Sequence, residues 1–318
     1  MTDTPSPLIW EEARDENTRE EVYRFRYEQY FSQKEYLPGT EHDARRVWLP
    51  HDEASRHFLV RAQDGRIAAV GTATGADEPS LFEEWRDIFA LSRLKPLLPQ
   101  TVIVSRVIVA RDARNTSLFG QMCLRLAVLL LEEGYRYAVH YCAPAMAAMY
   151  ERLGYRLYAC GRTLQSGVFR LPMILVPDDE AHLRRVRSPF RRLDRPEEEK
   201  RRGTTLALSV CPELAELPLC AMSAAQRVRR LTTLCPALRD APPALLRTAQ
   251  RGSFFPLRQG DMLAAAGMNE GSFLVLSGQM REGDRLCGPG DMLHSGNAAI
   301  SAERDALILS APFDAGDD

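Results

Sequence analysis

The side chain of Tyr150 and the polar turn Arg114-Asn115-Thr116-Ser117 are the parts of this sequence with the most specific chemistry. The turn precedes a segment of helical pattern, and a helix N-terminus offers unpaired N–H groups that can hold a pyrophosphate. A tyrosine phenol can donate a proton to a departing group. A thioester of coenzyme A or of a phosphopantetheine carrier needs both, since it brings phosphates and releases a sulfur.

Five consecutive elements are predicted to position these groups. A run of β-branched residues makes Thr101–Ala110 a strand covered on both faces. A helix is predicted over Ser117–Glu133, with Thr116 or Ser117 as its N-cap and Gly134 at its end. The remaining three are a strand (Arg136–Cys142), a helix (Pro144–Leu153) and a strand that starts at Tyr155.

Attack of an amine on an acyl thioester requires donors for the carbonyl oxygen and a proton for the sulfur. Backbone N–H groups near Val107 and Val109 are the candidate donors, wherever the ladder of their strand is interrupted. Tyr150 is the candidate acid, and a buried structural tyrosine is the alternative interpretation. Cys142 ends the preceding strand, and without a placed histidine it is interpreted as a buried thiol rather than a nucleophile.

The attacking amine must also be neutral, and the sequence offers three residues as its base. Asp52, Glu53 and His57 could each accept a proton directly or through water, and each could instead be a surface or capping group. Arg106 could bind a substrate carboxylate with two hydrogen bonds, or it could pair with an acid from the preceding loop.

Three segments resemble the GNAT superfamily of N-acyltransferases: Ser105–Val109, Arg111–Gly120 and Tyr150-Glu151-Arg152-Leu153-Gly154-Tyr155. The pyrophosphate loop departs from the superfamily pattern, because Ser117 and Phe119 replace small glycines. The sequence looks more like the branch of N-acyl amino acid synthases and N-acyl-homoserine-lactone synthases. The resemblance implies an acyl carrier protein or coenzyme A thioester as donor, without a metal. By this resemblance the thioester donor would be held by Arg114, Asn115, Thr116, Ser117, Leu118, Phe119 and Gly120.

The N-terminal part is similar to the same branch, in which an arginine-bearing helix leads into a loop with spaced acids. Arg24, Arg26, Tyr27, Asp43 and Asp52 are the residues that match this pattern. By this resemblance the amine substrate would meet Arg26, Asp43, Ser105 and Arg106. The lactone synthases carry a glutamate where this chain has Ile103, which argues against a homoserine-lactone product.

The C-terminal part has glycines at regular intervals between short apolar segments, as a small β-roll requires. The segment Phe273–Gln279 followed by Gly288-Pro289-Gly290-Asp291 resembles the cyclic nucleotide-binding domain. The phosphate-binding glutamate and arginine of that family are missing from Asp291–Ala299. We therefore interpret the C-terminal part as a degenerate roll that packs or dimerises. Binding of cyclic AMP is the alternative interpretation.

Length and composition set the remaining limits. A chain of 318 residues predicts three segments: an acyltransferase domain (1–193), a charged linker (194–222) and the roll (223–318). Seven dispersed cysteines and a polar N-terminus predict that the protein is located in the reducing cytoplasm. The histidines are also dispersed, so no metal site is predicted. No apolar run is long enough for a membrane span, and the aromatic residues expected of a nucleic-acid surface are scarce.

Two further segments have two interpretations each. The helix predicted within Ser80–Leu98 could form an acyl-chain wall or simply core packing. The charged segment Arg184–Gly203 could be a solvated linker or a docking surface for acidic acyl carrier protein. Its basic residues are Arg184, Arg185, Arg187, Arg191 and Arg192.

The sequence thus predicts an α+β protein with a GNAT-type mixed sheet and a small β-roll. The predicted function is N-acyl transfer, with a long acyl chain, to an amino acid or related amine. One alternative is an acetyl-coenzyme A-dependent N-acetyltransferase regulated by cyclic nucleotide. The other is a sensor that binds ligands and catalyses nothing. The partners considered are an acyl carrier protein and a second copy of the chain.

Overall fold

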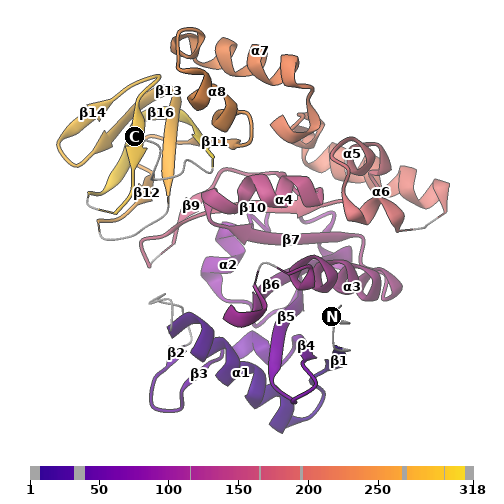
Figure 1. The fold of residues 1–318 in the computed structure, drawn as a ribbon. Helices are drawn as coiled ribbons and strands as arrows, with labels where there is room; N and C mark the ends of the chain where they lie inside the picture. The colour runs from indigo at the N-terminus through magenta and orange to yellow at the C-terminus, as the bar shows by residue number, and fades with distance from the viewer. Residues whose placement is uncertain are drawn as a thin grey trace, which may run out of the picture. The chain divides into compact units, whose positions relative to one another are not determined.

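The computed structural model describes residues 8–31, 40–114, 116–164, 166–193, 196–266, 271–296 and 298–311. The chain forms two compact units, one from Met1–Asp87 with Leu94–His140 and one from Ile88–Arg93 with Tyr141–Asp318. The predicted boundaries between acyltransferase domain, linker and roll, at residues 193 and 223, describe sequence modules rather than compact units. These boundaries stay a prediction. Figure 1 labels the elements of both units.

The first unit is built on a sheet in the order β1-β4-β5-β6-β7. Its pairs are antiparallel except for β6 and β7, which are parallel. The strands are β1 (Ile9–Glu12), β4 (Arg56–Arg61), β5 (Ile67–Gly75), β6 (Thr101–Val109) and β7 (Tyr137–Cys142). A small hairpin pairs β2 (Thr40–Glu41) with β3 (Arg46–Val47). The helices are α1 (Glu16–Phe31), η1 (Pro50–Asp52), α2 (Glu83–Ile88), η2 (Leu98–Gln100), η3 (Arg111–Ala113) and α3 (Leu118–Glu132).

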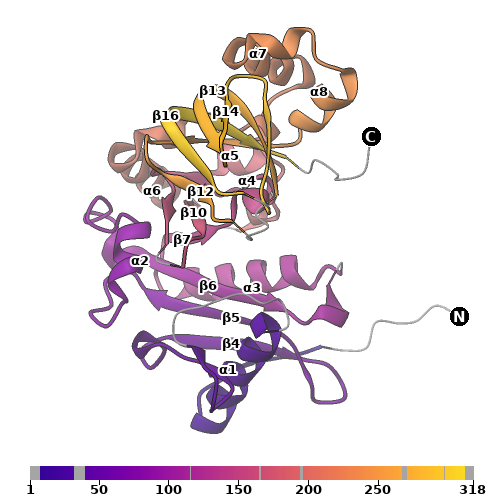
Figure 2. The same ribbon diagram turned by 90° about the vertical axis from the view of Figure 1, so that its left-hand side faces the viewer.

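Alternation along the strands places one helix on each face of this sheet. Phe58 and Val60 of β4 pack in one core with Met122 and Leu126 of α3. Leu59, between them, packs in the opposite core with apolar residues of α1. This follows from the two-residue period of strands and the apolar stripe of each helix. Figure 2 shows α1 and α3 on the two sides of β4 to β6.

The second unit contains an antiparallel set, in which β10 (Phe169–Leu175) pairs with β8 (Arg156–Leu157) and β9 (Arg162–Thr163). Its helices before residue 215 are η4 (Pro144–Met146), α4 (Ala147–Leu153), α5 (Glu180–Arg185), η5 (Pro189–Arg192), α6 (Glu197–Val210) and η6 (Pro212–Ala215). They are followed by η7 (Leu219–Ala221), α7 (Ala224–Leu234), η8 (Pro236–Arg239) and α8 (Pro243–Ala249). No helix among the described residues has both the length and the apolar character that a bilayer crossing requires.

The C-terminal strands form a separate antiparallel sheet, as the glycine pattern predicted. Its order is β11-β16-β13-β14, with β12 on β16 and β15 on β13. The bounds are β11 (Ser253–Leu257), β12 (Met262–Ala264), β13 (Ser272–Glu282), β14 (Arg285–Cys287), β15 (Met292–His294) and β16 (Ile300–Ser310). Its core includes Leu231 of α7 and Ala249 of α8. A bridge between Val168 and Ala264 links this sheet to the β10 segment within the second unit.

Two predicted helices are shorter in the structure, and the segment predicted as a linker is partly helical. The helix predicted within 80–98 is confined to α2, because Ala90 has a φ of 44° and breaks the helical backbone. The acidic residues at Asp178 and Asp179 predict a helix from an acidic cap to Leu193, and this helix is interrupted after α5, where Arg187 has a φ of 57° and Ser188 precedes a proline. The segment 194–222, predicted as a linker, contains the 14-residue helix α6.

Gly154 ends α4 in a conformation that other residues rarely adopt. Its φ is 108°, and a Cβ there would lie 2.5 Å from Cδ2 of Leu183. We expect Gly154→Ala to lower the free energy of unfolding by about 1–2 kcal/mol, since an alanine would be strained and crowded. Urea denaturation would measure this, with Gly288→Ala as control, where nothing lies within 4 Å of an added Cβ. An equal loss in both variants would contradict the explanation.

Candidate functional site

Strand β6 is interrupted at Arg106. The antiparallel register with β5 shifts between the pairs Val70–Ile108 and Thr72–Ser105, which marks a β-bulge. Arg106, inside the bulge, has a φ of 50°. Backbone strain of this kind persists only where the surroundings impose it, and it is common at functional sites.

The parallel pairing of β6 with β7 is also short. It covers Thr101–Ile103 of β6 and ends at the pair Ile103–Val139, while β6 continues to Val109. Beyond Ile103, the edge of β6 that faces away from β5 therefore has no ladder partner in β7. The expected donors at Val107 and Val109 lie in this segment, where N–H groups could meet a carbonyl oxygen.

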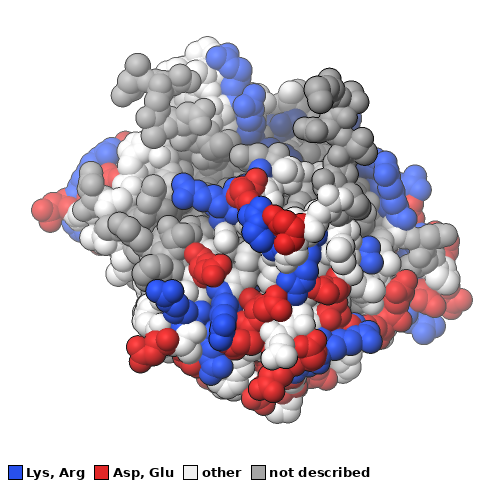
Figure 3. All heavy atoms as spheres, turned by 60° about the horizontal axis from the view of Figure 1, so that its bottom comes forward, with Lys and Arg blue, Asp and Glu red and all other residues white. Residues whose placement is uncertain are grey.

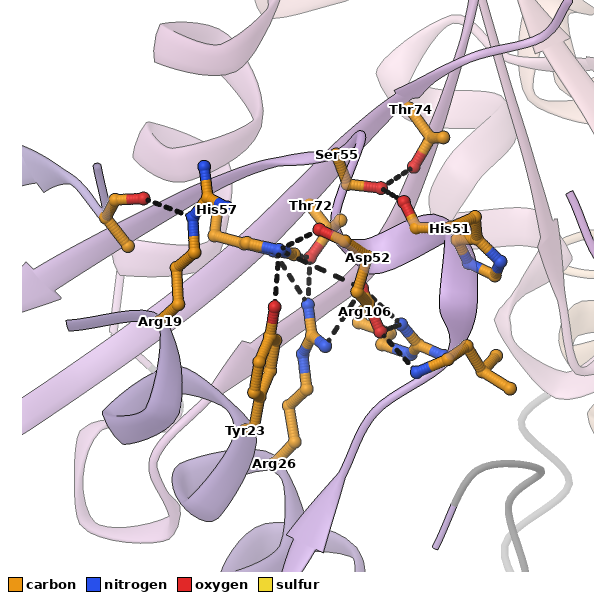
Figure 4. Close-up of polar contacts among 12 residues, drawn as sticks. Arg19, Tyr23, Arg26, His51, Asp52, Ser55, His57, Thr72, Thr74 and Arg106 are labelled. Atoms are coloured by element: carbon orange, nitrogen blue, oxygen red, sulfur yellow. Dashed lines mark hydrogen bonds and ion pairs between the residues drawn. The ribbon is translucent and has the colours of Figure 1, made fainter. Parts of the chain in front are cut away.

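The bulge carries Arg106 into a buried ion cluster (Figure 4). Its Nη1 lies 2.9 Å from both carboxylate oxygens of Asp52. Nη1 of Arg26, from α1, lies 3.1 Å from Oδ1 of the same carboxylate, and the backbone N–H of Leu49 donates to Oδ2 at 2.8 Å. The side chains of Arg26 and Asp52 are fully buried. Arg106 thus pairs with a loop acid, which was one of its two interpretations.

The two arginines determine the charge of Asp52. Burial by itself would raise the pKa of this carboxyl, but the positive charges of Arg106 and Arg26 outweigh it and hold the pKa well below its usual range. Burial lowers the pKa of Arg26 to about 10, against the opposing effect of Asp52. Asp52 is therefore ionised at neutral pH and is a weak proton acceptor.

His57, on β4, is neutral and fully engaged by its neighbours. Its Nε2 lies 2.9 Å from the backbone carbonyl oxygen of Asp52, so Nε2 carries the proton and donates it. Nδ1 therefore accepts, and Arg26 Nη2 and Thr72 Oγ1 lie 3.0 Å and 3.2 Å from it. Burial, reinforced by the charge of Arg26, lowers the pKa of His57 to about 4. Its lone pair holds Arg26 in place.

His51 is a buried imidazole that the sequence did not single out. It is fully buried in η1, and both of its ring nitrogens have no hydrogen-bond partner among the described residues. Its ring lies 4.5 Å from that of Trp85, and the guanidinium of Arg106 lies 5.4 Å from the same indole. Burial, with the charge of Arg106, lowers the pKa of His51 to about 4. In the neutral ring one nitrogen carries a proton and the other keeps a lone pair, and both lie beneath the surface with their hydrogen-bonding capacity unused by the described residues.

The other residues predicted for this site lie at its margin. Glu53 and Asp43 are exposed. Ser105 precedes the bulge, and its hydroxyl is shielded from water without a partner among the described residues. Arg24 is exposed and pairs with Glu20 at 2.9 Å.

The start of α3 is the candidate pyrophosphate site. Ser117 is its N-cap residue but makes no side-chain cap bond, whereas the hydroxyl of Thr116 accepts from the N–H of Leu118 at 3.2 Å. The neighbouring Arg114 is exposed and donates to the carbonyl oxygen of Val109 at 3.3 Å. Phe119 and Gly120 belong to the first turn of the helix, and Asn115 lies outside the described residues. The first turn of α3 thus begins directly after the exposed residues Thr116 and Ser117, and the N–H of Leu118 is already bound by Thr116.

Tyr150 belongs to the second unit, on α4. Its side chain is half-buried, and its ring lies 5.7 Å from that of Tyr155 at an angle of 84°. Cys142 is buried, and its thiol lies 3.6 Å from the sulfur of Met173. Burial raises the pKa of this thiol far above neutrality, which agrees with a packing role.

Charges of both signs alternate on the face of the first unit shown in Figure 3. Arg61 pairs with Glu21 at 2.8 Å, and Arg66 pairs with Asp64 at 2.7 Å. Arg46 lies 2.8 Å from Glu41. Pairing of this kind neutralises the described part of this surface locally.

No protein-family model and no curated protein sequence matches this chain. It is similar to the solved structure of FeeM, an N-acyl amino acid synthase from uncultured soil microbes, at 13% identity and a TM-score of 0.45, covering 56% of this chain and 96% of FeeM. It is also similar to BjaI, a CoA-dependent acyl-homoserine lactone synthase, at 16% identity and a TM-score of 0.45, covering 60% of this chain and 92% of BjaI. For the AHL synthase LasI the identity is 16%, the TM-score 0.43 and the coverage 54% and 90%.

Proposed function

We propose that this chain is a GNAT-type N-acyltransferase of the N-acyl amino acid synthase branch. It moves a long acyl group from an acyl carrier protein or coenzyme A thioester to the amine of an amino acid or related compound. The observation that carries this proposal is the bulged strand β6, in which Arg106 has a φ of 50° and is bound to Asp52. The strand precedes a helix N-terminus and loses its pairing with β7 at Ile103.

The donor would be bound by backbone groups along one segment of the chain. The first turn of α3, with Arg114 and Thr116 beside it, would hold the phosphates. The N–H groups of Val107 and Val109 would donate to the thioester carbonyl oxygen as negative charge develops on it. Both sets of donors belong to the backbone, so loss of the usual glycines changes the fit of the loop but leaves the donors in place.

The amine substrate would be recognised by Arg106. Only its Nη1 is bound to Asp52, and neither Nε nor Nη2 has a hydrogen-bond partner among the described residues. These two groups form the fork that binds a carboxylate with two hydrogen bonds. In this proposal Arg26 and Asp52 are positioning residues, because both are fully buried and hold Arg106 in its strained conformation.

The chemical step forms a C–N bond and breaks the C–S bond. Tyr150 would give its proton to the departing sulfur and recover it from solvent. Of the bases considered, Asp52 is held by two arginines, His57 has no open lone pair, and Glu53 is exposed. We propose that His51 accepts a hydrogen bond from an N–H of the neutral amine. This hydrogen bond would aim the lone pair of the amine at the thioester carbon. With a pKa of about 4 His51 orients the amine, and the proton passes to water.

The roll is proposed to be a degenerate cyclic nucleotide-binding type domain. Its corners at Gly271, Gly278, Gly283 and Gly290 all have positive φ, as such a roll requires. The segment after Gly290 has no glutamate–arginine pair for a cyclic phosphate. Its role in this proposal is packing against the rest of the second unit.

The proposal is tested by incubating the purified chain with acyl carrier protein and coenzyme A thioesters of several chain lengths and with pooled amino acids. Mass spectrometry should detect N-acyl amino acids and the released thiol in equal amounts. Transfer from acetyl-coenzyme A alone would favour the acetyltransferase alternative. Absence of any product, together with tight cyclic-AMP binding, would refute the enzymatic function in favour of the sensor.

Replacement of Tyr150 separates its two interpretations. We expect Tyr150→Phe to lower kcat about 100-fold, the smaller end of general acid effects, with little change in KM. Tyr155→Phe is the control, since it removes a phenol from the adjacent ring and should leave kcat within about twofold. Initial rates measured with the best donor decide. Equal kcat in Tyr150→Phe and wild type would make Tyr150 a structural tyrosine.

A further inference from the structure

The second unit contains a cavity that the acyl-transfer chemistry does not use. It has a volume of about 730 Å³ and is lined by residues of the β8–β9 segment, of the 213–218 segment, of α7 and of the roll. Pockets of roughly 300–1,000 Å³ can enclose a small organic molecule. Its size is therefore that of a ligand site.

Two residues of this lining each have a buried polar atom that no described residue pairs. Glu151 is 5% exposed; its Oε1 accepts from Ser253 Oγ at 2.6 Å, and its Oε2 has no partner among the described residues. Arg156 is 6% exposed; its terminal nitrogens bind Leu214 O at 2.6 Å and Asp179 at 2.8 Å, and its Nε has no partner within the described ranges. Leaving a buried donor or acceptor unpaired destabilises the fold unless something else satisfies it. Glu151 and Arg156 thus bring one unsatisfied acceptor and one unsatisfied donor to the wall of the cavity, just beneath its surface.

The rim of the cavity is basic after its own ion pairs are counted. Arg93 is paired with Glu213 at 2.5 Å, and Arg156 with Asp179. Arg162, Arg230 and Arg258 line the cavity, are exposed, and make no ion pair with any described residue. They outnumber the acids left at the rim, Glu216 and Asp261. An anionic group of a ligand would be attracted to this side.

The rest of the lining is apolar. Half-buried carbon side chains of Leu157, Leu217, Phe254 and Leu307 face the cavity together with prolines 218 and 256. Arg230 lies over the ring of Phe254 at 5.6 Å. An apolar body would bury these surfaces at about 25 cal/mol per Å².

From these three features we propose that this cavity is a regulatory site for an N-acylated amino acid or a close analogue. The amide N–H of such a ligand would meet Glu151 Oε2, and the amide oxygen would meet Arg156 Nε. Its carboxylate would pair with the rim arginines, and its acyl chain would cover the apolar wall. The site is described from the second unit alone, so binding does not depend on the proposed function.

The cavity is connected to the helix that carries Tyr150. Glu151 is the next residue on α4, and its bond to Ser253 ties this helix to β11. Arg152 Nη2 donates to the carbonyl oxygen of Arg251 at 3.1 Å, which adds a second tie to the roll. A ligand that engages Glu151 therefore acts on α4 directly. This regulatory half rests on the proposed function, in which the ligand would be the reaction product.

Calorimetric titration of the full chain with N-lauroylglycine, kept below its micelle concentration, tests the site. We expect saturable binding, weakened about tenfold or more in Arg230→Gln and in Arg258→Gln, as loss of a charge-assisted hydrogen bond predicts. Arg229→Gln is the matched control, since Arg229 is the exposed neighbour that does not line the cavity. It should bind within twofold of wild type. Laurate lacks the amide, and N-lauroylglycine methyl ester lacks the negative charge. Each should bind at least tenfold more weakly than N-lauroylglycine.

The proposal would be overturned by no saturable binding, by equal weakening in Arg229→Gln, or by tighter Arg230-dependent binding of AMP than of N-lauroylglycine. Binding lost in Arg106→Gln but kept in Arg230→Gln would place the ligand elsewhere and would also refute it. If acyl transfer is found, added N-lauroylglycine should slow it in wild type and not in Arg230→Gln. If no transfer is found but the cavity binds the probe, the proposed function fails and the site stands.

Discussion

Asp52→Asn is expected to lower the free energy of unfolding by about 3–5 kcal/mol, which is large against the stability of a typical domain. The carboxylate of Asp52 is bound by Arg26 and Arg106, and Arg26 has no exposed surface. An asparagine keeps the size of the side chain but leaves two guanidinium charges close together without an anion. Chemical denaturation with urea measures the loss.

The control is Glu53→Gln, one residue further along the chain. Glu53 is exposed, so its loss should change the free energy of unfolding by less than about 0.5 kcal/mol. If Asp52→Asn changed the free energy of unfolding as little as Glu53→Gln, the ion cluster would make no net contribution to stability. The wild-type protein should also lose stability in acid, because the pKa of Asp52 is depressed. Its contribution is present above the usual aspartate pKa and is lost as the pH falls through the folded value.

The elements around this cluster were predictable because their signals are local. The hairpin of β4 and β5 follows from two apolar segments around the Asp64-Gly65 turn. Turn chemistry and capping act over a few residues, so the sequence carries them directly. The length of helix α2 was overestimated, because the helical backbone breaks at Ala90 and no glycine or proline at that position indicates the break.

The cluster itself was predictable only as a set of residue types. Asp52, His57 and Arg106 could be named from the sequence, but their roles depend on contacts between residues far apart in the chain. Arg26 reaches Asp52 across 26 positions, and Arg106 reaches it across 54. Tertiary packing of this kind decides which nitrogen of His57 carries the proton and which one accepts from Arg26. His51 was missed because a single histidine after a proline in a loop has no periodic pattern.

The same reasoning applies to Glu151, which the sequence placed beside Tyr150 only as part of a motif. In the structure its side chain is fully enclosed and bound to Ser253, 102 positions later. Burial raises the pKa of this carboxyl to about 7, although the hydrogen bond from Ser253 and the charge of Arg152 oppose the shift. A buried acid at this position is therefore a source of instability that depends on pH.

Glu151→Gln is accordingly expected to stabilise the protein at pH 8 by about 3 kcal/mol and to change little at pH 4. Below the usual glutamate pKa of 4.5, the carboxyl is neutral in both the folded and the unfolded chain. Between that value and about 7 the folded state keeps a proton that the unfolded state releases, so wild-type stability falls as the pH rises. Above pH 7 the folded protein holds a buried charge, which the glutamine lacks while its amide oxygen still accepts from Ser253. Urea denaturation at pH 4, 6 and 8 measures the difference, with Glu216→Gln as control, since Glu216 lines the same cavity but is exposed. Parallel pH profiles for wild type and Glu151→Gln would show that this carboxyl is not buried as a charge, and the acceptor of the regulatory site would be lost with it.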